Sequence, residues 1–543
     1  RVRIDNTHSE YEGKLYASSS NTLTDGSSQG HYTVNNGQYS QTYADVLVNI
    51  NKRIQDFTIV ANIGASYSGV TSKELGYAGP IRETGIPNLF NVYDLDNAKK
   101  RATQVGWREA TESIFASAEV GWKSMLYLTV TGRNDWASQL THSPQASFFY
   151  PSVGLSAVIT EILKLPDWVD YLKVRGSFSS VGNPYPRFLT YPTYSYDANK
   201  QDWKSQTNYP IGKLYPERTD SWEVGLDATL FKDFKLSGSF YYANTYNQTF
   251  YADLSLSSGY SNIPIQSGNI MNEGLEMSLG YNKQWKDFSF NTNYTLTWNK
   301  NRVKRLADGV YNYATGQPIQ MPELSPLTYG HTDARLILRV GGSMGDVYGQ
   351  RLLKRDLNGY ILNEEGVGLA MENKETYLGS ILPKMNMGWS LGFGYKGVNL
   401  GMTFTGRFGG IVISETQSVL DAAGVSKVSA DVRDAGGVQI NQSKVSAQTY
   451  YQTIQGTAAY YTYSATNVRL GELSLSYTLP KKWFDNKVGM TVGLVGKNLW
   501  MIYCKAPFDP ELTTSAASNF YQGFDAYMLP STRNFGFNVK FQF

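Results

Sequence analysis

The stretch FSFNTNYTLTWN, residues 288–299, places apolar and polar side chains at alternating positions. Its apolar set is aromatic or aliphatic and consists of Phe288, Phe290, Tyr294, Leu296 and Trp298. The opposing set, from Ser289 to Asn299, contains only Ser, Thr and Asn. Successive side chains of a β-strand point to opposite faces of its sheet. The stretch therefore predicts a strand with one apolar face and one polar face.

The same alternation recurs in both directions along the chain. FTIVANIGASY (57–67), MLYLTVTG (125–132) and SWEVGLDATLF (221–231) each place most of their apolar side chains on one face. Counted in this way, the sequence predicts an all-β fold of about fifteen strands. These strands fall near residues 41–52, 57–69, 113–122, 125–136, 149–160, 171–181, 220–231, 234–247, 272–285, 288–300, 387–395, 398–408, 467–480, 487–499 and 533–543.

Composition narrows the class of protein. Charged residues make up 17% of the chain, against roughly 25% in soluble proteins, and aromatic residues make up 14%. No run approaches the ~18 apolar residues of a transmembrane helix, so a helical membrane protein is excluded. A net charge of +3 lacks the basic footprint of nucleic-acid binding. One cysteine and four scattered histidines offer no disulfide framework or zinc spacing, so we expect no cofactor and no metal.

The connections between the expected strands alternate between very short and very long. Very short connectors occur at Gln55-Asp56, Lys123-Ser124, Lys232-Asp233, Lys286-Asp287 and Lys396-Gly397. Long polar stretches fall near residues 70–112, 182–219, 301–386 and 409–466. A soluble β-sandwich shows the same alternation within its strands, so the strands alone do not decide. Short periplasmic turns with long extracellular loops are typical of a transmembrane antiparallel β-barrel of the outer membrane.

The chain ends in NFGFNVKFQF, residues 534–543, whose apolar stripe continues to the last residue. In water such a strand would risk edge-to-edge aggregation. In a barrel, lipid covers the apolar face and closure of the ring satisfies the backbone. Following the alternation of connections, the last strand runs from the outside to the periplasm. We expect Phe541 and Phe543 to form the C-terminal assembly signal.

The N-terminal end fits a complete barrel less well. Residues 1–40 offer RVRI (1–4) and then a polar stretch rich in Gly and Ser, so the sequence predicts a stub as its first strand. A complete barrel has an even number of strands and both termini on the periplasmic side. We therefore expect residues 1–543 to be the C-terminal part of a single outer-membrane barrel domain, with its first strands absent from this sequence.

An ordered series of motifs carries a resemblance to a known family. The series includes LTVTGRNDWASQL (128–140), SFFYPSVGLSAVI (147–159), YLKVRGSFSSVGN (171–183), GNIMNEGLEMSL (268–279), VRLGELSLSYTLP (468–480), DPE (509–511) and LPSTRNFGFNVKFQF (529–543). In order and spacing these motifs resemble the SusC/RagA family of TonB-dependent outer-membrane transporters over roughly residues 43–543.

The resemblance implies a larger assembly. It implies a 22-stranded barrel, of which this chain supplies about fifteen or sixteen strands, closed by a plug that lies outside the present sequence. It implies import of oligosaccharides, or of peptides, beneath a SusD-like surface lipoprotein that acts as a lid. The TonB–ExbB–ExbD complex would act through the plug, in the outer membrane of a Bacteroidota-like bacterium with its lipopolysaccharide, and transporter–lid pairs could form dimers.

Three polar motifs have ordinary structural interpretations. DLNGYILNEE supplies Asp356, Asn358 and Gly359 but has Tyr360 where a calcium loop needs an acid, so it predicts a plain Asn-Gly turn. Asp509 and Glu511 of DPE could suggest acid/base chemistry. We interpret them instead as a structural loop motif, GRNDW (132–136) as an ion pair beside an interfacial aromatic, and the chain as not an enzyme.

Substrate contact is expected from aromatic loop residues, because sugar rings stack on flat apolar faces. PTYSYDANKQDW offers Tyr194, Tyr196 and Trp203 as candidates. The lone Cys504 is interpreted as a buried or interfacial thiol without a redox role. The alternative to the importer is a self-contained passive porin of about sixteen strands. A third possibility is a barrel that binds at the cell surface and transports nothing.

Overall fold

The computed structural model describes residues 1–543 except 191–192, 198–201, 210–213, 254–258, 307–322, 365–367, 513 and 516–518. Contacts divide the chain into two compact units. Unit 1 comprises Arg1–Gly154, Ser179–Thr219 and Tyr251–Gln266, and unit 2 comprises Leu155–Phe178, Asp220–Phe250 and Ser267–Phe543.

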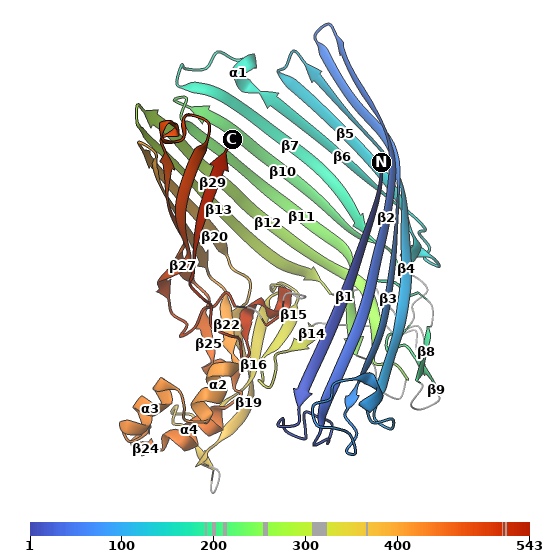
Figure 1. The fold of residues 1–543 in the computed structure, drawn as a ribbon, viewed down its shortest axis with the longest axis vertical. Coiled ribbons are helices and arrows are strands. Elements are labelled where there is room, and N and C mark those ends of the chain that lie inside the picture. The colour runs from blue at the N-terminus through green and yellow to red at the C-terminus, as the bar shows by residue number, and fades with distance from the viewer. Residues whose placement is uncertain are drawn as a thin grey trace. The chain divides into compact units, whose positions relative to one another are not determined.

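The largest sheet in the described residues has sixteen strands, in agreement with the number that the sequence predicts (Figure 1). In sheet order they are β1 (Val2–Tyr16), β2 (Gly30–Ile54), β3 (Phe57–Pro80), β4 (Arg101–Trp122), β5 (Leu126–Ala137), β6 (Phe148–Val158), β7 (Val169–Asn183), β10 (Glu217–Leu230), β11 (Phe234–Asp253), β12 (Asn262–Trp285), β13 (Phe288–Arg305), β20 (Met385–Tyr395), β21 (Val398–Phe408), β26 (Asn467–Leu479), β27 (Gly489–Cys504) and β29 (Asn534–Gln542). Strands β1 and β29 stand at the two ends of this order.

The expectation of a stub at the N-terminus is wrong. Strand β1 pairs with β2 along its whole length, from Val2 opposite Ala44 to Tyr16 opposite Gly30. The alternation of apolar side chains does not reveal it, because most side chains of β1 on both faces are polar. Its stability comes from the backbone ladder with β2, which needs no apolar face.

Strands β2, β3 and β4 also run well beyond their expected bounds. The β2–β3 ladder continues from Ile54 opposite Phe57 to His31 opposite Pro80. Strand β4 then pairs with β3 from Arg101 onward. Much of the expected loop 70–112 is therefore strand. These extensions carry polar side chains on both faces, so hydrophobic alternation stops before the hydrogen-bonded ladder does.

The tight turns occur where the sequence predicts them. Lys123 and Ser124 between β4 and β5 have φ of 51° and 58°, and Lys396 between β20 and β21 has φ of 44°. Two-residue hairpin turns of type I′ require positive φ at both central residues, because their twist then matches that of the flanking strands. The alternation of short and long connections is thus confirmed.

The long connections contain ordered structure of their own. The smaller strands are β8 (Tyr194–Asp197), β9 (Asp202–Ser205), β14 (Glu323–Thr328), β15 (Arg335–Arg339), β16 (Asp346–Leu353), β17 (Asn363–Glu364), β18 (Gly368–Leu369), β19 (Met371–Ser380), β22 (Ile411–Ser414), β23 (Val438–Ile440), β24 (Ser443–Val445), β25 (Thr462–Ser464) and β28 (Phe524–Asp525). The helices are α1 (Ile159–Ile162), α2 (Glu415–Ala422), α3 (Lys427–Asp434) and α4 (Ala447–Ile454), with short 3₁₀ turns at Val92–Asp94, Ser138–Leu140, Ala458–Tyr460, Lys481–Phe484 and Asn519–Gly523.

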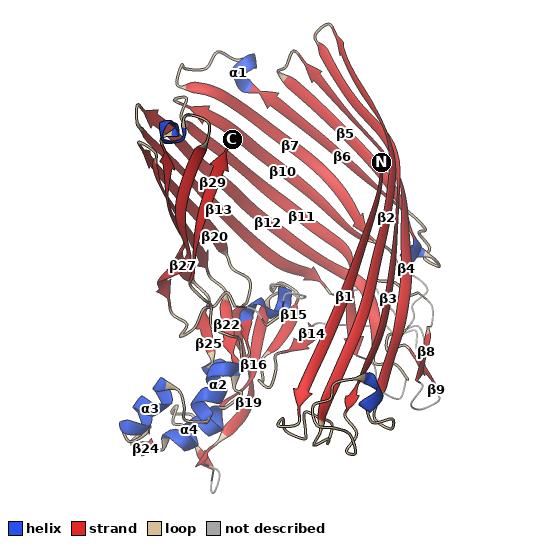
Figure 2. Cartoon of the chain, in the orientation of Figure 1, coloured by secondary structure: helices blue, strands red, loops and turns tan. Residues whose placement is uncertain are grey.

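Three connections of unit 2 share one buried apolar cluster. Leu336 and Val347 from the β13–β20 connection pack with Ile413 from the β21–β26 connection and Phe524 from the segment after β27. Helices α2, α3 and α4 lie together in the β21–β26 connection (Figure 2). From the sequence these connections are predicted only as long and polar. Their buried cluster is not predicted, because the apolar residues that form it come from separate segments of the chain. The helices in the described part of the chain do not reach the length and hydrophobicity that a membrane-spanning helix requires.

Candidate functional site

The three aromatic residues predicted to contact substrate lie together on one small hairpin. Tyr194 and Tyr196 belong to β8 and Trp203 to β9, and Tyr196 is the register partner of Trp203. The rings of Tyr196 and Trp203 meet edge to face with centroids 5.4 Å apart. Tyr194, Tyr196 and Trp203 are 62%, 55% and 64% exposed, so large parts of their rings are open to a ligand. Their role in binding cargo stays a prediction.

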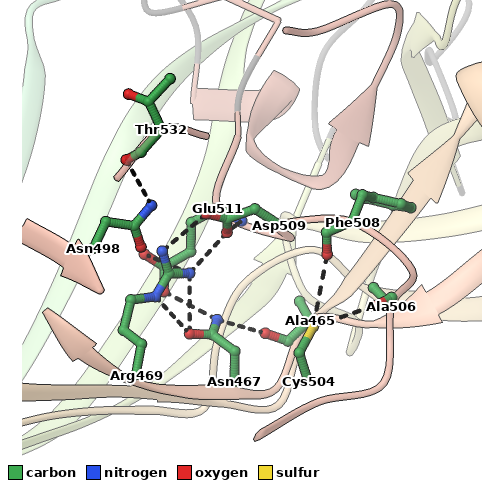
Figure 3. A network of polar contacts seen from close by, with 10 residues as sticks. All are labelled: Ala465, Asn467, Arg469, Asn498, Cys504, Ala506, Phe508, Asp509, Glu511 and Thr532. Atoms are coloured by element: carbon green, nitrogen blue, oxygen red, sulfur yellow. Dashed lines mark hydrogen bonds and ion pairs between the residues drawn. The ribbon is translucent and has the colours of Figure 1, made fainter. Parts of the chain in front are cut away.

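A network of polar contacts ties the DPE motif to β26 (Figure 3). Both terminal guanidinium nitrogens of Arg469 donate to the Asp509 carboxylate, at 2.9 and 2.8 Å. The Arg469 Nε donates to Asn467 Oδ1 at 3.2 Å, and Asn467 Nδ2 donates to Glu511 Oε1 at 3.0 Å. The Arg469 and Asp509 side chains are only 10% and 8% exposed. The interpretation of DPE as a structural loop motif is confirmed, although its partner Arg469 was missed.

The ion pair between Asp509 and Arg469 holds the DPE loop against β26. Burial alone would raise the pKa of Asp509, but the hydrogen bonds from Arg469 and from the Glu511 N–H outweigh it, so the pKa lies below its usual value. The carboxylate is therefore ionised at neutral pH and pairs bidentately with the guanidinium, the strongest form of such a contact. Cys504, at the end of β27, is partly buried, with Sγ 3.5 Å from the Ala506 carbonyl oxygen.

The other two polar motifs show the expected ion pair and the expected turn. Arg133 of GRNDW pairs with Asp135 at 2.7 Å and donates to Ser113 Oγ at 2.7 Å. In DLNG, Asp356 Oδ1 accepts the N–H groups of Asn358 and Tyr360 at 2.9 and 2.8 Å. With Gly359 at φ +85°, this is an Asx-type turn.

A cavity of about 780 Å³ opens where β13 outruns β20, a feature that the sequence did not predict. The β13–β20 ladder ends at Trp298 opposite Met385, but β13 continues to Arg305. Val303 exchanges two backbone hydrogen bonds of 2.8 Å with Gly341 and Gly342, which replace β20 there. The cavity lies in the gap between the end of the β13–β20 ladder and the segment of Gly341 and Gly342. Its lining includes three cationic side chains and one carboxylate, namely Lys300, Arg302, Lys384 and Asp346.

The acidic side of the cavity is held by two hydrogen bonds. Asp346 Oδ2 accepts the Ser343 N–H at 2.8 Å, and Oδ1 accepts the Tyr377 hydroxyl at 3.1 Å. Burial raises the pKa of the Asp346 carboxyl, despite both hydrogen bonds. Burial and the nearby Asp346 raise the pKa of Tyr377 to about 12, so the phenol stays a donor at neutral pH. Both Asp346 oxygens therefore accept hydrogen bonds from within the chain. The three cationic side chains outnumber this one carboxyl group in the lining of the cavity.

The two C-terminal phenylalanines are accessible. Strand β29 pairs with β27, from Asn534 opposite Lys497 to Gln542 opposite Gly489. Phe541 lies within this ladder, and Phe543 lies one residue beyond the strand with its ring stacked 6.5 Å from that of Phe541. Both side chains are exposed. Their role as an assembly signal stays a prediction.

Comparison with known proteins places this fold in a family. A family model described as "TonB dependent receptor-like, beta-barrel" matches residues 2–499. The TonB-dependent receptor P3 of Formosa agariphila is 24% identical over 518 residues, which cover 88% of this chain and 50% of that receptor. The TonB-dependent receptor P26 of the same bacterium is 24% identical over 506 residues, 84% of this chain and 48% of the receptor.

Solved structures agree with the family model. The RagAB peptide importer in its open-open state superimposes with a TM-score of 0.73 and 17% identity, over 99% of this chain and 58% of that one. A second structure of the RagAB peptide transporter gives a TM-score of 0.70 and 18% identity, over 92% and 55%. At these identities the likeness shows the fold alone. The chain spans about half the length of the relatives it matches. It belongs to the family of TonB-dependent receptor-like β-barrels and is an outer-membrane protein.

Proposed function

We propose that this chain is the C-terminal part of a SusC-like, TonB-dependent importer of peptides or oligosaccharides. The observation that carries the proposal is the match of the family model to residues 2–499, together with the ordered SusC/RagA motifs. The fold likeness to a peptide importer supports it over nearly the whole chain. In this proposal the plug and the first strands of the barrel belong to the remainder of the protein.

The described residues supply a place for cargo contact. The rings of Tyr196 and Trp203 meet edge to face, so each keeps an open apolar surface. Sugar rings and apolar peptide side chains both stack on such surfaces. The hairpin lies in a long connection, and long connections are extracellular in outer-membrane barrels. We therefore propose that the Tyr194, Tyr196 and Trp203 hairpin contacts cargo at the cell surface.

The proposed assembly has further partners. A SusD-like surface lipoprotein would cover the extracellular mouth, and transporter–lid pairs could associate as dimers. The TonB–ExbB–ExbD complex would supply energy through the plug. The structured connections of unit 2, with their own buried core, offer a firm extracellular surface for a lid, because a preorganised surface loses less entropy on binding.

Uptake by whole cells tests the proposal. Cells that express the full-length protein together with its neighbouring lipoprotein would receive a labelled peptide or oligosaccharide, with and without an uncoupler of the proton-motive force. An active importer is expected to lose accumulation when the uncoupler is added. Deletion of the full-length gene alone is the matched control for uptake by other routes.

The sixteen strands of the sheet also fit a passive porin, which is the alternative. A porin would equilibrate the labelled cargo in the presence of the uncoupler. It would also give a steady single-channel conductance in a planar bilayer. Either result from the full-length protein would contradict the importer and favour the porin.

A further inference from the structure

Three cations follow the apolar stripe of β13 on the same face of the strand. Leu296 and Trp298 end the stripe, and the next side chains of the same parity are Lys300, Arg302 and Lys304. These three cationic residues are exposed. We call them the cation row.

The opposite face of the same segment is covered. Asn301 donates to Asn272 Oδ1 at 2.9 Å and accepts the Met344 N–H at 2.8 Å. Val303 is completely buried in an apolar cluster with Ile270 and Leu338. The covered face is the one on which the connections pack, so the cation row points the other way, toward the side that carries the apolar stripe.

Charge in the row is only partly compensated. Lys300 pairs with Glu273 at 3.0 Å, and Lys304 Nζ donates to the Tyr242 hydroxyl at 2.6 Å. Arg302 stands between them and contacts no carboxylate in the described part of the chain. Three cations with one paired acid leave a local excess of about two positive charges. Lys300 and Arg302 also line the cavity of about 780 Å³ beside Trp298, so Arg302 adjoins an open space.

The row lies at the level of lipid headgroups. It precedes the long β13–β20 connection, and long connections are extracellular in outer-membrane barrels. Trp at the end of an apolar stripe marks the membrane interface. With a rise of about 3.3 Å per residue and a tilt of about 40°, Lys300 and Arg302 stand about 5 and 10 Å farther out than Trp298. The polar headgroup layer begins within this distance of the hydrocarbon.

We propose that Lys300, Arg302 and Lys304 bind the phosphorylated headgroup of an outer-leaflet lipid, with Arg302 as the principal contact. Guanidinium groups bind phosphate bidentately, and an uncompensated guanidinium beside an open cavity provides such a site. The inference rests on the outer-membrane location and is independent of the proposed transport activity.

Native mass spectrometry of the full-length protein in detergent tests this site. The probes are bisphosphorylated lipid A, the same lipid after removal of both phosphates, and inorganic phosphate as a competitor. The variants are Arg302→Gln and the double variant Arg302→Gln/Lys304→Gln. The matched control is Lys286→Gln, which removes an exposed cation from the tight turn at the other end of the β12–β13 hairpin.

We expect phosphorylated lipid A to bind the unaltered protein more tightly than the dephosphorylated lipid. Each cation removed should weaken that binding about fivefold, whereas Lys286→Gln should not change it. Equal binding of the two lipids to the unaltered protein would overturn the proposal without reference to any variant. An equal loss of lipid A binding in Arg302→Gln and Lys286→Gln would show that the net charge of the protein, and not this site, determines the binding. Full displacement by millimolar inorganic phosphate would make this a site for free phosphate instead.

Discussion

At the scale of single residues, the Arg469–Asp509 pair is the contact whose loss we expect to cost most. Replacing Asp509 by Asn leaves the buried guanidinium with only the more distant, partly exposed Glu511 as a charge partner, and breaking a buried ion pair typically costs about 3–5 kcal/mol. We expect the Glu511 amide, which donates to Asp509 Oδ1 at 3.0 Å, to exchange its hydrogen at least about 100-fold faster in Asp509→Asn. Hydrogen exchange of the full-length protein measures this.

The control for that prediction lies two residues away. Glu511 is 39% exposed and stands 3.5 Å from Arg469, so Glu511→Gln should cost about 1 kcal/mol or less. Because the pKa of Asp509 is below its unfolded value, its stabilisation is present above about pH 4 and is lost as pH falls through the folded pKa. Equal exchange rates in the two variants would show that the loop is held by other contacts.

Trp203 carries the residue-scale prediction for cargo. We expect Trp203→Ala to raise the half-saturating cargo concentration by about threefold to tenfold, since an aromatic contact is worth about 1 kcal/mol, and to leave the maximal rate unchanged. Trp168, exposed and stacked on Phe231 at 5.6 Å, provides the matched control as Trp168→Ala. A concentration-dependent uptake assay distinguishes the two. The same shift in both variants would exclude a specific role for the hairpin.

Part of the candidate site could be predicted from residue types alone. Exposed aromatics between polar residues pointed to Tyr196 and Trp203, and a strand register then placed them opposite each other. DPE is interpreted as structural because it matches a loop motif of the family that the sequence resembles. Its partner could not be read from the sequence, because Arg469 and Asp509 are separated by the whole of β27 and meet only through sheet pairing.

At the scale of elements, the extended ladder between β2 and β3 makes a prediction. Amides in residues 31–40 and 71–80 should exchange within about tenfold of those in residues 45–54, because one continuous register joins them. Peptide-resolved hydrogen exchange of the full-length protein provides the comparison. Exchange at the rate of an unstructured peptide in residues 71–80 would mean that the strand ends near residue 69, as the alternation of side chains alone suggests.

Hydrophobic alternation predicts only the part of a strand that has an apolar face. Residues 288–299 show it at every position except Thr292, and they lie within β13 as predicted. Residues 1–40 lack it, and most of β1 and the first part of β2 were missed there. Backbone pairing does not depend on side-chain polarity, so polar strands leave no periodic signal. The helices α2–α4 were not predicted either, because each has only eight residues, which is too short for a helical period to be recognised in the sequence.

At the scale of the whole molecule, we expect the mature protein from native outer membranes to be well above 60.6 kDa. The relatives are about twice as long as the segment that matches them, and the proposed importer needs a plug. Intact mass and N-terminal sequencing would measure this directly. A mature chain that begins at Arg1 and forms the entire ring by itself would favour the porin.

The β21–β26 connection leaves and returns at neighbouring positions of one ladder, with Arg407 opposite Asn467. A segment attached in this way can be exchanged for another of different length, provided that the two flanking positions keep their spacing and the new segment fills the buried cluster that Ile413 shares with the neighbouring connections. Recombination between related genes at these points could therefore replace the whole surface structure of α2–α4 in one event. The strands on either side would keep their partners, so new surfaces could evolve without a new membrane scaffold.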